Sequence, residues 1–216
     1  MSILSKVVGL ISRNDEGGGN AVCFGVMSTM TERPGERKIL ARLAENGLTA
    51  FHLRRPHWTL AQHKSWLDAL PAEVRSRVVV HAFPQLVRRC GLAGFQLPSP
   101  ETPVPAGTPG EISAQCEDYQ AMLRVGKNCA RIMLGPVFPP KKYDVTVPRR
   151  TLGEYAAIAS YWRRHGGRAK VVAFGGVDAS NVHLCRRAGF DGFVVVGAVW
   201  DAPDPVKAFA NLVRKW

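Results

Sequence analysis

Val171-Val172-Ala173-Phe174-Gly175-Gly176-Val177 and Gly192-Phe193-Val194-Val195-Val196-Gly197-Ala198 are the two stretches that decide the fold. Each joins a run of apolar, mostly β-branched residues to glycine. A run without polar alternation is typical of a parallel strand that is covered on both faces. Glycine at its end lets backbone N–H groups approach an anion closely. The loops after the seventh and eighth strands of a (β/α)8 barrel frequently bind phosphate, so the two stretches favour that fold and that site.

Apolar strand-like runs alternate with helix-like amphipathic segments about every 25 residues, which indicates repeated βαβ units. Eight strands are expected near residues 21–28, 49–53, 77–81, 93–97, 110–113, 130–134, 170–174 and 192–197. Helices are expected near residues 36–46, 59–70, 83–90, 115–126, 151–165, 179–189 and 204–215. The segment Leu97–Gly107 holds four prolines, so the fourth crossover is predicted to be a loop.

The length and composition fit one domain. A chain of 216 residues with 46% hydrophobic content can bury one sizeable core. We therefore predict a single α/β TIM barrel over residues 21–216, preceded by an N-terminal extension at residues 1–20. Within the extension, Val7–Ile11 reads as an extra strand and Gly17–Gly19 as a flexible join. We expect the extension to cover the bottom of the barrel or a partner subunit.

The sequence carries no targeting signal that we recognise. It has no run of about 18 uncharged apolar residues, and Arg13–Glu16 come too early for the apolar region of a secretory signal. We expect a cytoplasmic protein without a membrane partner. The cysteines are odd in number, scattered and never spaced C-x-x-C, which predicts free thiols rather than disulfides or a zinc site; they are Cys23, Cys90, Cys116, Cys129 and Cys185.

The formal net charge is +12, with Lys and Arg spread along the chain, often in pairs such as Arg88-Arg89 and Arg186-Arg187. Most pairs fall in helix-like segments, where a solvated outer face is the simplest interpretation. Such a field would also attract a phosphorylated substrate. A nucleic-acid-binding protein remains an alternative, but aromatic interleaving and recognised nucleic-acid motifs are lacking, so we expect no nucleic-acid partner.

Four short strings give the sequence a resemblance to a known family. They are Phe51-His52-Leu53-Arg54, Gly135-Pro136-Val137-Phe138-Pro139 with Lys141-Lys142, Phe174-Gly175-Gly176-Val177, and Gly197-Ala198-Val199. In order and spacing they resemble the thiamine phosphate synthase and TenI superfamily from about residue 21 to the C-terminus. The Gly-Pro-Val-Phe-Pro string with nearby lysines is the most specific of the four.

The resemblance implies a transferase that joins hydroxymethylpyrimidine pyrophosphate to a thiazole phosphate and releases pyrophosphate. It implies that Arg54 and Ser113 contact pyrophosphate, and that Lys141 or Lys142 closes onto it. It further implies that Gly175, Gly176, Gly197 and Ala198 hold the thiazole phosphate through backbone N–H groups, that Glu101 helps to bind Mg²⁺, and that the protein is a homodimer. The simpler alternatives are a structural Arg54, a Ser113 that caps the next helix, solvated lysines and a surface Glu101.

The chain also departs from the synthase pattern. His81-Ala82 stands where the synthases have asparagine and aspartate, and Pro56 replaces a lysine two positions after Arg54. Gln96-Leu97-Pro98-Ser99 and His52-Leu53-Arg54 resemble the TenI branch, which implies a thiazole tautomerase, or a relative that binds phosphate ligands without catalysis. The histidine of that branch is Pro136 here, so His52 and His81 are candidate general bases, with Tyr143 and Asp144 as further candidates on the loop.

Overall fold

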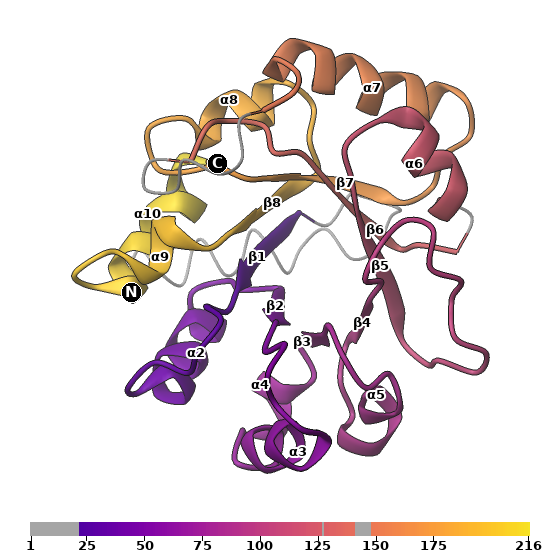
Figure 1. Ribbon diagram of the computed structural model, residues 1–216. Helices are drawn as coiled ribbons and strands as arrows, with labels where there is room; N and C mark the ends of the chain where they lie inside the picture. The colour runs from indigo at the N-terminus through magenta and orange to yellow at the C-terminus, as the bar shows by residue number, and fades with distance from the viewer. Residues whose placement is uncertain (1–21, 127, 141–147) are drawn as a thin grey trace, which may run out of the picture.

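A computed structural model describes residues 22–126, 128–140 and 148–216. In these residues eight parallel strands form a closed barrel in chain order, as the sequence predicted (Figure 1). The strands are β1 (Cys23–Met27), β2 (Ala50–Leu53), β3 (Val78–Val80), β4 (Gly94–Gln96), β5 (Glu111–Cys116), β6 (Arg131–Leu134), β7 (Lys170–Phe174) and β8 (Gly192–Val195). The predicted extension at residues 1–20 lies outside the described residues, so the division at residue 21 stays a prediction.

Helices surround the barrel (Figure 1). They are α2 (Glu36–Glu45), α3 (Leu60–Asp68), α4 (Ala72–Arg75), α5 (Gln85–Cys90), α6 (Tyr119–Val125), α7 (Leu152–Arg164), α8 (Val182–Arg187), α9 (Gly197–Trp200) and α10 (Pro205–Lys215). The short helices α4 and α9 were not predicted, because four residues are too few to show a helical period. The prediction for the last helix is confirmed: the Asp204 side chain accepts hydrogen bonds from the N–H groups of Val206 and Lys207, and Pro205 is the first helical residue.

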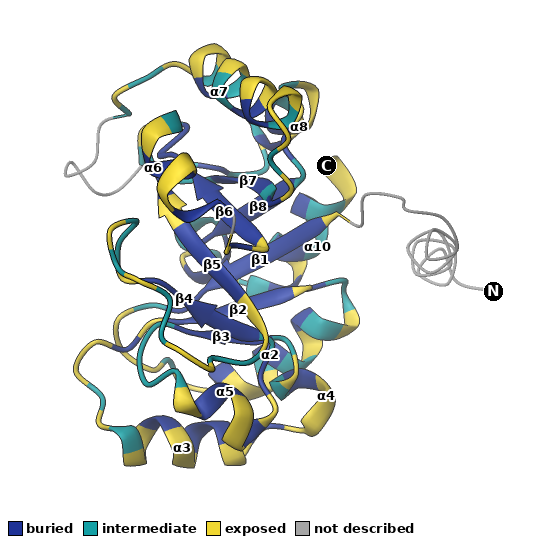
Figure 2. Ribbon diagram, turned by 90° about the vertical axis from the view of Figure 1, so that its right-hand side faces the viewer, coloured by how far each residue is buried: buried dark blue, intermediate teal, exposed yellow. Residues whose placement is uncertain are grey.

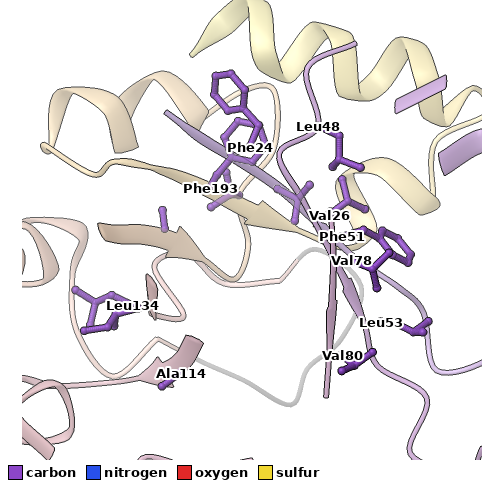
Figure 3. Close-up of a cluster of buried hydrophobic side chains, with 14 of the residues drawn as sticks. Phe24, Val26, Leu48, Phe51, Leu53, Val78, Val80, Ala114, Leu134 and Phe193 are labelled. Carbon is purple, nitrogen blue, oxygen red and sulfur yellow. The ribbon is translucent and has the colours of Figure 1, made fainter. Parts of the chain in front are cut away.

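The strands separate two apolar layers, because successive side chains point to opposite faces of the sheet. The larger layer lies between strands and helices, where the Phe51 ring stacks on Trp66 with ring centres 6.0 Å apart. Figure 3 shows part of this layer, including Phe24 and Phe193, whose ring centres lie 5.1 Å apart. Figure 2 shows the strands buried and the exposed residues mainly on the helices and loops around them. A smaller cluster fills the barrel itself and consists of Cys23, Met27, Met133, Val172 and Val194.

The fifth strand differs from its prediction. The sequence placed its end at Ser113 and a helix over 115–126, whereas β5 continues to Cys116 and α6 begins at Tyr119. In β5 Ile112, Ser113, Ala114 and Cys116 are buried and Gln115 is exposed, and Asp118 caps the helix by accepting from the N–H of Ala121. The interpretation of Ser113 as a helix cap is therefore wrong.

The fourth crossover is a loop, as the prolines predicted, because no helix lies between β4 and β5. Two hollows of about 330 and 320 Å³ flank this loop, one against α6 and one against α5. All five cysteines are buried free thiols, which confirms that prediction. Among the described residues, none of the helices has the length and apolar character needed to cross a bilayer.

A buried ion pair fixes the connection after β1 to the end of β2. The Arg55 guanidinium donates to both Glu36 carboxylate oxygens, at 2.6 and 2.7 Å, and also to the backbone oxygen of Thr29. Both side chains are fully buried, and the guanidinium lies 5.2 Å from the centre of the Trp58 ring. Burial raises the pKa of Glu36, against the lowering effect of the Arg33 N–H and the Arg55 charge.

Removing one partner of this pair should leave a buried charge without an opposite charge beside it. We expect Glu36→Ala to lower the free energy of unfolding by about 3–5 kcal/mol in urea titrations. The matched control is Arg37→Ala, because Arg37 is exposed on the same helix, and its effect should stay within about 0.5 kcal/mol. A Glu36→Ala variant as stable as this control would show that the pair does not hold the two segments.

Candidate active site

The carboxyl ends of the barrel strands form one mouth, and most of the predicted site residues lie there. His52 and Arg54 belong to the end of β2, and His81 directly follows β3. Gly175-Gly176 follow β7, and Gly197-Ala198 begin α9 after β8. In barrels of this type the catalytic groups come from this end of several strands.

Arg54 is exposed and free of acidic partners among the described residues. Its backbone is clamped by Ser28, whose Oγ accepts from the Arg54 N–H at 2.9 Å and donates to the Arg54 oxygen at 3.2 Å. Its Nη1 lies 3.2 Å from the sulfur of Met30. The buried, carboxylate-paired arginine is its neighbour Arg55, so Arg54 keeps a planar guanidinium that can bind two phosphate oxygens.

His52 and His81 form a hydrogen-bonded pair beside Arg54. The His52 Nδ1 lies 3.2 Å from the His81 Nε2, and His52 is fully buried whereas His81 is half-buried. Burial, with a smaller contribution from the Arg54 charge, lowers the pKa of His81 to about 3. Burial also holds the pKa of His52 well below its usual range, helped by the charges of His81 and Arg131. Both rings are therefore neutral at physiological pH.

Ser113 lies inside the barrel wall rather than at its mouth. It is buried in the middle of β5, and its Oγ donates to the Gln96 Oε1 at 2.7 Å. Gln115, two residues further along the same face of β5, is exposed at the end of the strand. The structure thus gives Ser113 a hydrogen bond within the protein, and its predicted contact with pyrophosphate stays a prediction.

Gly175 and Gly176 form a turn that no side chain would fit. Their φ angles are +86° and +65°, in the region that favours glycine. A Cβ on Gly175 would lie 2.5 Å from the Cβ of Pro136, and one on Gly176 would collide with the backbone oxygen of Phe138. The two segments are joined by hydrogen bonds from the N–H of Val137 to the Phe174 oxygen, 2.9 Å, and from the N–H of Phe138 to the Gly175 oxygen, 3.2 Å.

Gly197 and Ala198 occupy the first two positions of α9. Their N–H groups precede the first helical hydrogen bonds, which Val199 and Trp200 donate to the oxygen of Val196. A Cβ on Gly197 would lie 2.9 Å from the Asp201 carboxylate, which would have to shift to admit a side chain. Asp201 is itself paired with Arg33 at 3.5 Å, which offsets part of its negative charge.

The remaining predicted residues are either not described or lie away from the mouth. Lys141, Lys142, Tyr143 and Asp144 lie outside the described residues. Glu101 is exposed and forms a 3.2 Å ion pair with Arg124, in the last turn of α6 on the outer layer.

A magnesium site built from carboxylates does not fit the described residues. In this part of the chain no three His, Cys, Asp or Glu side chains gather closely enough to hold a metal. Glu101, the predicted ligand, is engaged by Arg124. We therefore assign no step to Mg²⁺.

Sequence reasoning missed three polar residues that shape the site. Arg55 takes the structural role considered for Arg54, and Gln96 binds Ser113. Arg131 lies buried at the start of β6, where it pairs with Glu111 at 2.9 Å and keeps two guanidinium nitrogens without a hydrogen-bond partner. The alternation of inward- and outward-facing residues along β4 and β6 would have predicted that Gln96 and Arg131 face the barrel interior. The sequence Arg54-Arg55 alone does not show which arginine is buried.

The chain is 32% identical to the thiamine-phosphate synthase of Halorhodospira halophila over 107 residues, which are 49% of this chain and 48% of that protein. It is 27% identical to the thiamine-phosphate synthase of Chromobacterium violaceum over 141 residues, 61% of this chain and 63% of that protein. The matches thus span about half to two thirds of these relatives. No family model matches the chain.

Two solved structures share the fold. A thiamine phosphate pyrophosphorylase from Bacteroides thetaiotaomicron superposes with a TM-score of 0.72 at 22% identity, covering 89% of this chain and 96% of that one. The thiamine phosphate pyrophosphorylase from Pyrococcus furiosus gives the same TM-score and identity, covering 91% and 96%. The chain is thus similar in sequence to thiamine-phosphate synthases over part of its length, and it shares the barrel fold of the two solved structures.

Proposed function

We propose that the protein is a thiamine phosphate synthase-type transferase, which joins hydroxymethylpyrimidine pyrophosphate to a thiazole phosphate. The proposal rests on two features at one mouth that suit anions. Arg54 offers an exposed guanidinium free of acidic partners in the described structure, and the turns at Gly175-Gly176 and Gly197-Ala198 offer backbone free of large side chains. The substrates of this reaction carry one anion for each feature.

The reaction is a substitution at the pyrimidine methylene carbon. The bond from this carbon to the pyrophosphate oxygen breaks, its electron pair leaves with pyrophosphate, and the thiazole nitrogen forms the new bond to the carbon. In the proposal Arg54 binds the pyrophosphate oxygens on which negative charge develops, and it lowers the barrier by neutralising that charge. The backbone N–H groups after β7 and β8 hold the thiazole phosphate and so orient the nucleophile.

The neutral histidine pair fits this reaction better than it fits base catalysis. An imidazole with a pKa near 3 takes up a proton poorly at neutral pH, and no proton is removed in the bond-forming step. In the proposal the pair is a rigid neutral surface beneath the substrate. The 3.2 Å hydrogen bond between His52 and His81 fixes the orientation of the His81 ring.

Arg54→Ala tests the transferase proposal. The purified protein, given both phosphorylated precursors and Mg²⁺, should form thiamine phosphate, and the variant should lose about 100-fold or more in kcat/KM, because it lacks the cation at the leaving group. The kcat/KM of Arg54→Lys should lie between those of the wild type and Arg54→Ala, because lysine keeps the charge but lacks the planar guanidinium.

The matched control is Arg37→Ala, an exposed arginine on α2 with no place in the mouth, which should keep its rate within about twofold. Wild-type protein that forms no thiamine phosphate under any metal condition would refute the proposal. Equal loss in Arg54→Ala and Arg37→Ala would refute the role of Arg54.

A thiazole tautomerase is the second candidate, and the contact between His52 and His81 is the observation that favours it, because a proton shift needs an acid and a base. This candidate requires at least one ring to titrate near neutral pH. Burial without a carboxylate partner in the described residues opposes that requirement, so the pH dependence of stability decides between the two functions.

Histidines that stay neutral when folded should make the protein less stable as pH falls. The unfolded state takes up a proton near pH 6.5 and folded His81 only at about 3, so stability is complete above about pH 6.5 and declines between these values. Between about pH 7.5 and about pH 5, urea titrations should show His81 contributing a loss of about 1–2 kcal/mol.

The His81→Gln variant should show a smaller loss over the same pH range. If the unfolding free energy of His81→Gln falls with pH as steeply as that of the wild type, the pKa of His81 is not lowered by folding. A base is then available for the tautomerase reaction.

A further inference from the structure

The side chain of Ser28 takes the place of a backbone group at the point where β1 ends. Ser28 directly follows β1, and its N–H donates to the His52 oxygen at 2.9 Å, which continues the ladder between β1 and β2 by one bond. In a regular parallel ladder the next bond would run from the Arg54 N–H to the backbone oxygen of Ser28. The Arg54 N–H donates instead to the Ser28 Oγ at 2.9 Å, and this hydroxyl donates to the Arg54 oxygen at 3.2 Å. One buried hydroxyl therefore holds both backbone polar groups of Arg54.

The loop after Ser28 contacts both arginines that follow β2. The Thr29 oxygen accepts a hydrogen bond from the guanidinium of Arg55, which is fully buried. The sulfur of Met30 lies 3.2 Å from the Nη1 of Arg54, which is exposed. The loop is thus held in place by Arg55, and it contacts Arg54 at the backbone through Ser28 and at the guanidinium through Met30.

The peptide group between Met27 and Ser28 is fixed on both of its sides. Its oxygen, which belongs to Met27, accepts a hydrogen bond from the indole N–H of Trp200 at 2.8 Å, and Trp200 is buried in α9. Its N–H is the one that Ser28 donates to His52. Further along the loop, the Arg33 Nη1 donates to the Trp200 oxygen at 2.8 Å. Because this peptide is bonded to α9 and to β2, the Ser28 hydroxyl that it carries has a defined position.

Arg54 depends on its backbone for its position. Its guanidinium has no carboxylate partner in the part of the chain that the structure describes, and its contact with the Met30 sulfur is weak. An arginine held by an acidic side chain would keep its place if the backbone moved, whereas Arg54 would move with it. A shift of about 1 Å in a group that positions a substrate can cost about 100-fold in rate.

We propose that Ser28 is a positioning residue, whose hydroxyl holds the Arg54 backbone so that the guanidinium meets the pyrophosphate group of the substrate. This inference rests on the proposed transferase function and adds a residue to it. Ser28 is buried and acts through Arg54 rather than on the substrate. Removing its hydroxyl should therefore matter only in a protein that still has Arg54.

A double-mutant cycle in the transferase assay tests this role. Ser28→Ala should lower kcat/KM about tenfold or more, because it releases the Arg54 backbone. The double variant Ser28→Ala with Arg54→Ala should be as fast as Arg54→Ala alone. A hydroxyl that serves only the stability of the barrel would slow Arg54→Ala by the same factor as the wild type, and that result would overturn the proposal. Circular dichroism at the assay temperature checks that each variant is folded.

Two further variants separate the hydrogen bonds from the volume of the side chain. Thr29→Val is the matched control, because the Thr29 hydroxyl donates to the Thr31 oxygen and not to Arg54, and its kcat/KM should stay within about twofold of the wild type. Ser28→Cys keeps the shape of the side chain, but a thiol forms only weak hydrogen bonds, so it should lose activity as Ser28→Ala does. Wild-type activity in Ser28→Cys, or a loss in Thr29→Val as large as that in Ser28→Ala, would overturn the role of the hydroxyl.

Calorimetric titration with inorganic pyrophosphate separates this inference from the transferase proposal, because it needs no turnover. Ser28→Ala should bind pyrophosphate about fivefold or more weakly than the wild type, and Thr29→Val should bind it equally well. If these affinities are found but the wild type forms no thiamine phosphate, the transferase proposal fails and the role of Ser28 stands. If the wild type forms thiamine phosphate but Ser28→Ala binds pyrophosphate as tightly as the wild type, the role of Ser28 alone fails. Wild-type protein that binds no pyrophosphate would also overturn the role of Ser28.

Discussion

The close approach of two loops is the constraint on which the proposed phosphate site depends. The segment after β6 lies so near the turn after β7 that a Cβ on Gly175 would meet Pro136, and one on Gly176 would meet the backbone of Phe138. Hydrogen bonds from Val137 and Phe138 hold the segments together. Both positions also have positive φ, which disfavours residues with a side chain. Contacts and backbone conformation therefore both require glycine at this edge of the mouth.

The polar residues at the end of β2 and just after it have different roles according to their burial. Arg55 forms a buried ion pair with Glu36, which links the connection after β1 to the end of β2. Arg54 is exposed. His52 points inward and uses one nitrogen on His81. A charged imidazole would be unfavourable there, since Arg131 lies inside the same barrel and Arg54 at its mouth. The mouth thus keeps its positive charge on arginine, where proton transfer cannot remove it.

The sequence predicted the barrel well because its evidence is local. Apolar runs and helical spacing located all eight strands, and the prolines of Leu97–Gly107 correctly predicted a crossover without a helix. It misplaced the end of β5, because Ser113-Ala114-Gln115 contains no strong strand signal and helix-like residues follow. Long-range facts could not be predicted: which of Arg54 and Arg55 is buried, that Gln96 binds Ser113, and that Glu101 pairs with Arg124.

In the proposed function, backbone N–H groups at the mouth receive the phosphate of a thiazole phosphate. The most direct measurement is a titration of this ligand into ¹⁵N-glycine-labelled protein, followed by amide chemical shifts. We expect the Gly175, Gly176 and Gly197 signals to move with one saturable binding curve, and those of Gly166 and Gly189, which follow α7 and α8 at the opposite end, to stay in place. Saturable binding that leaves the three mouth glycines unmoved, or no binding at all, would contradict the account.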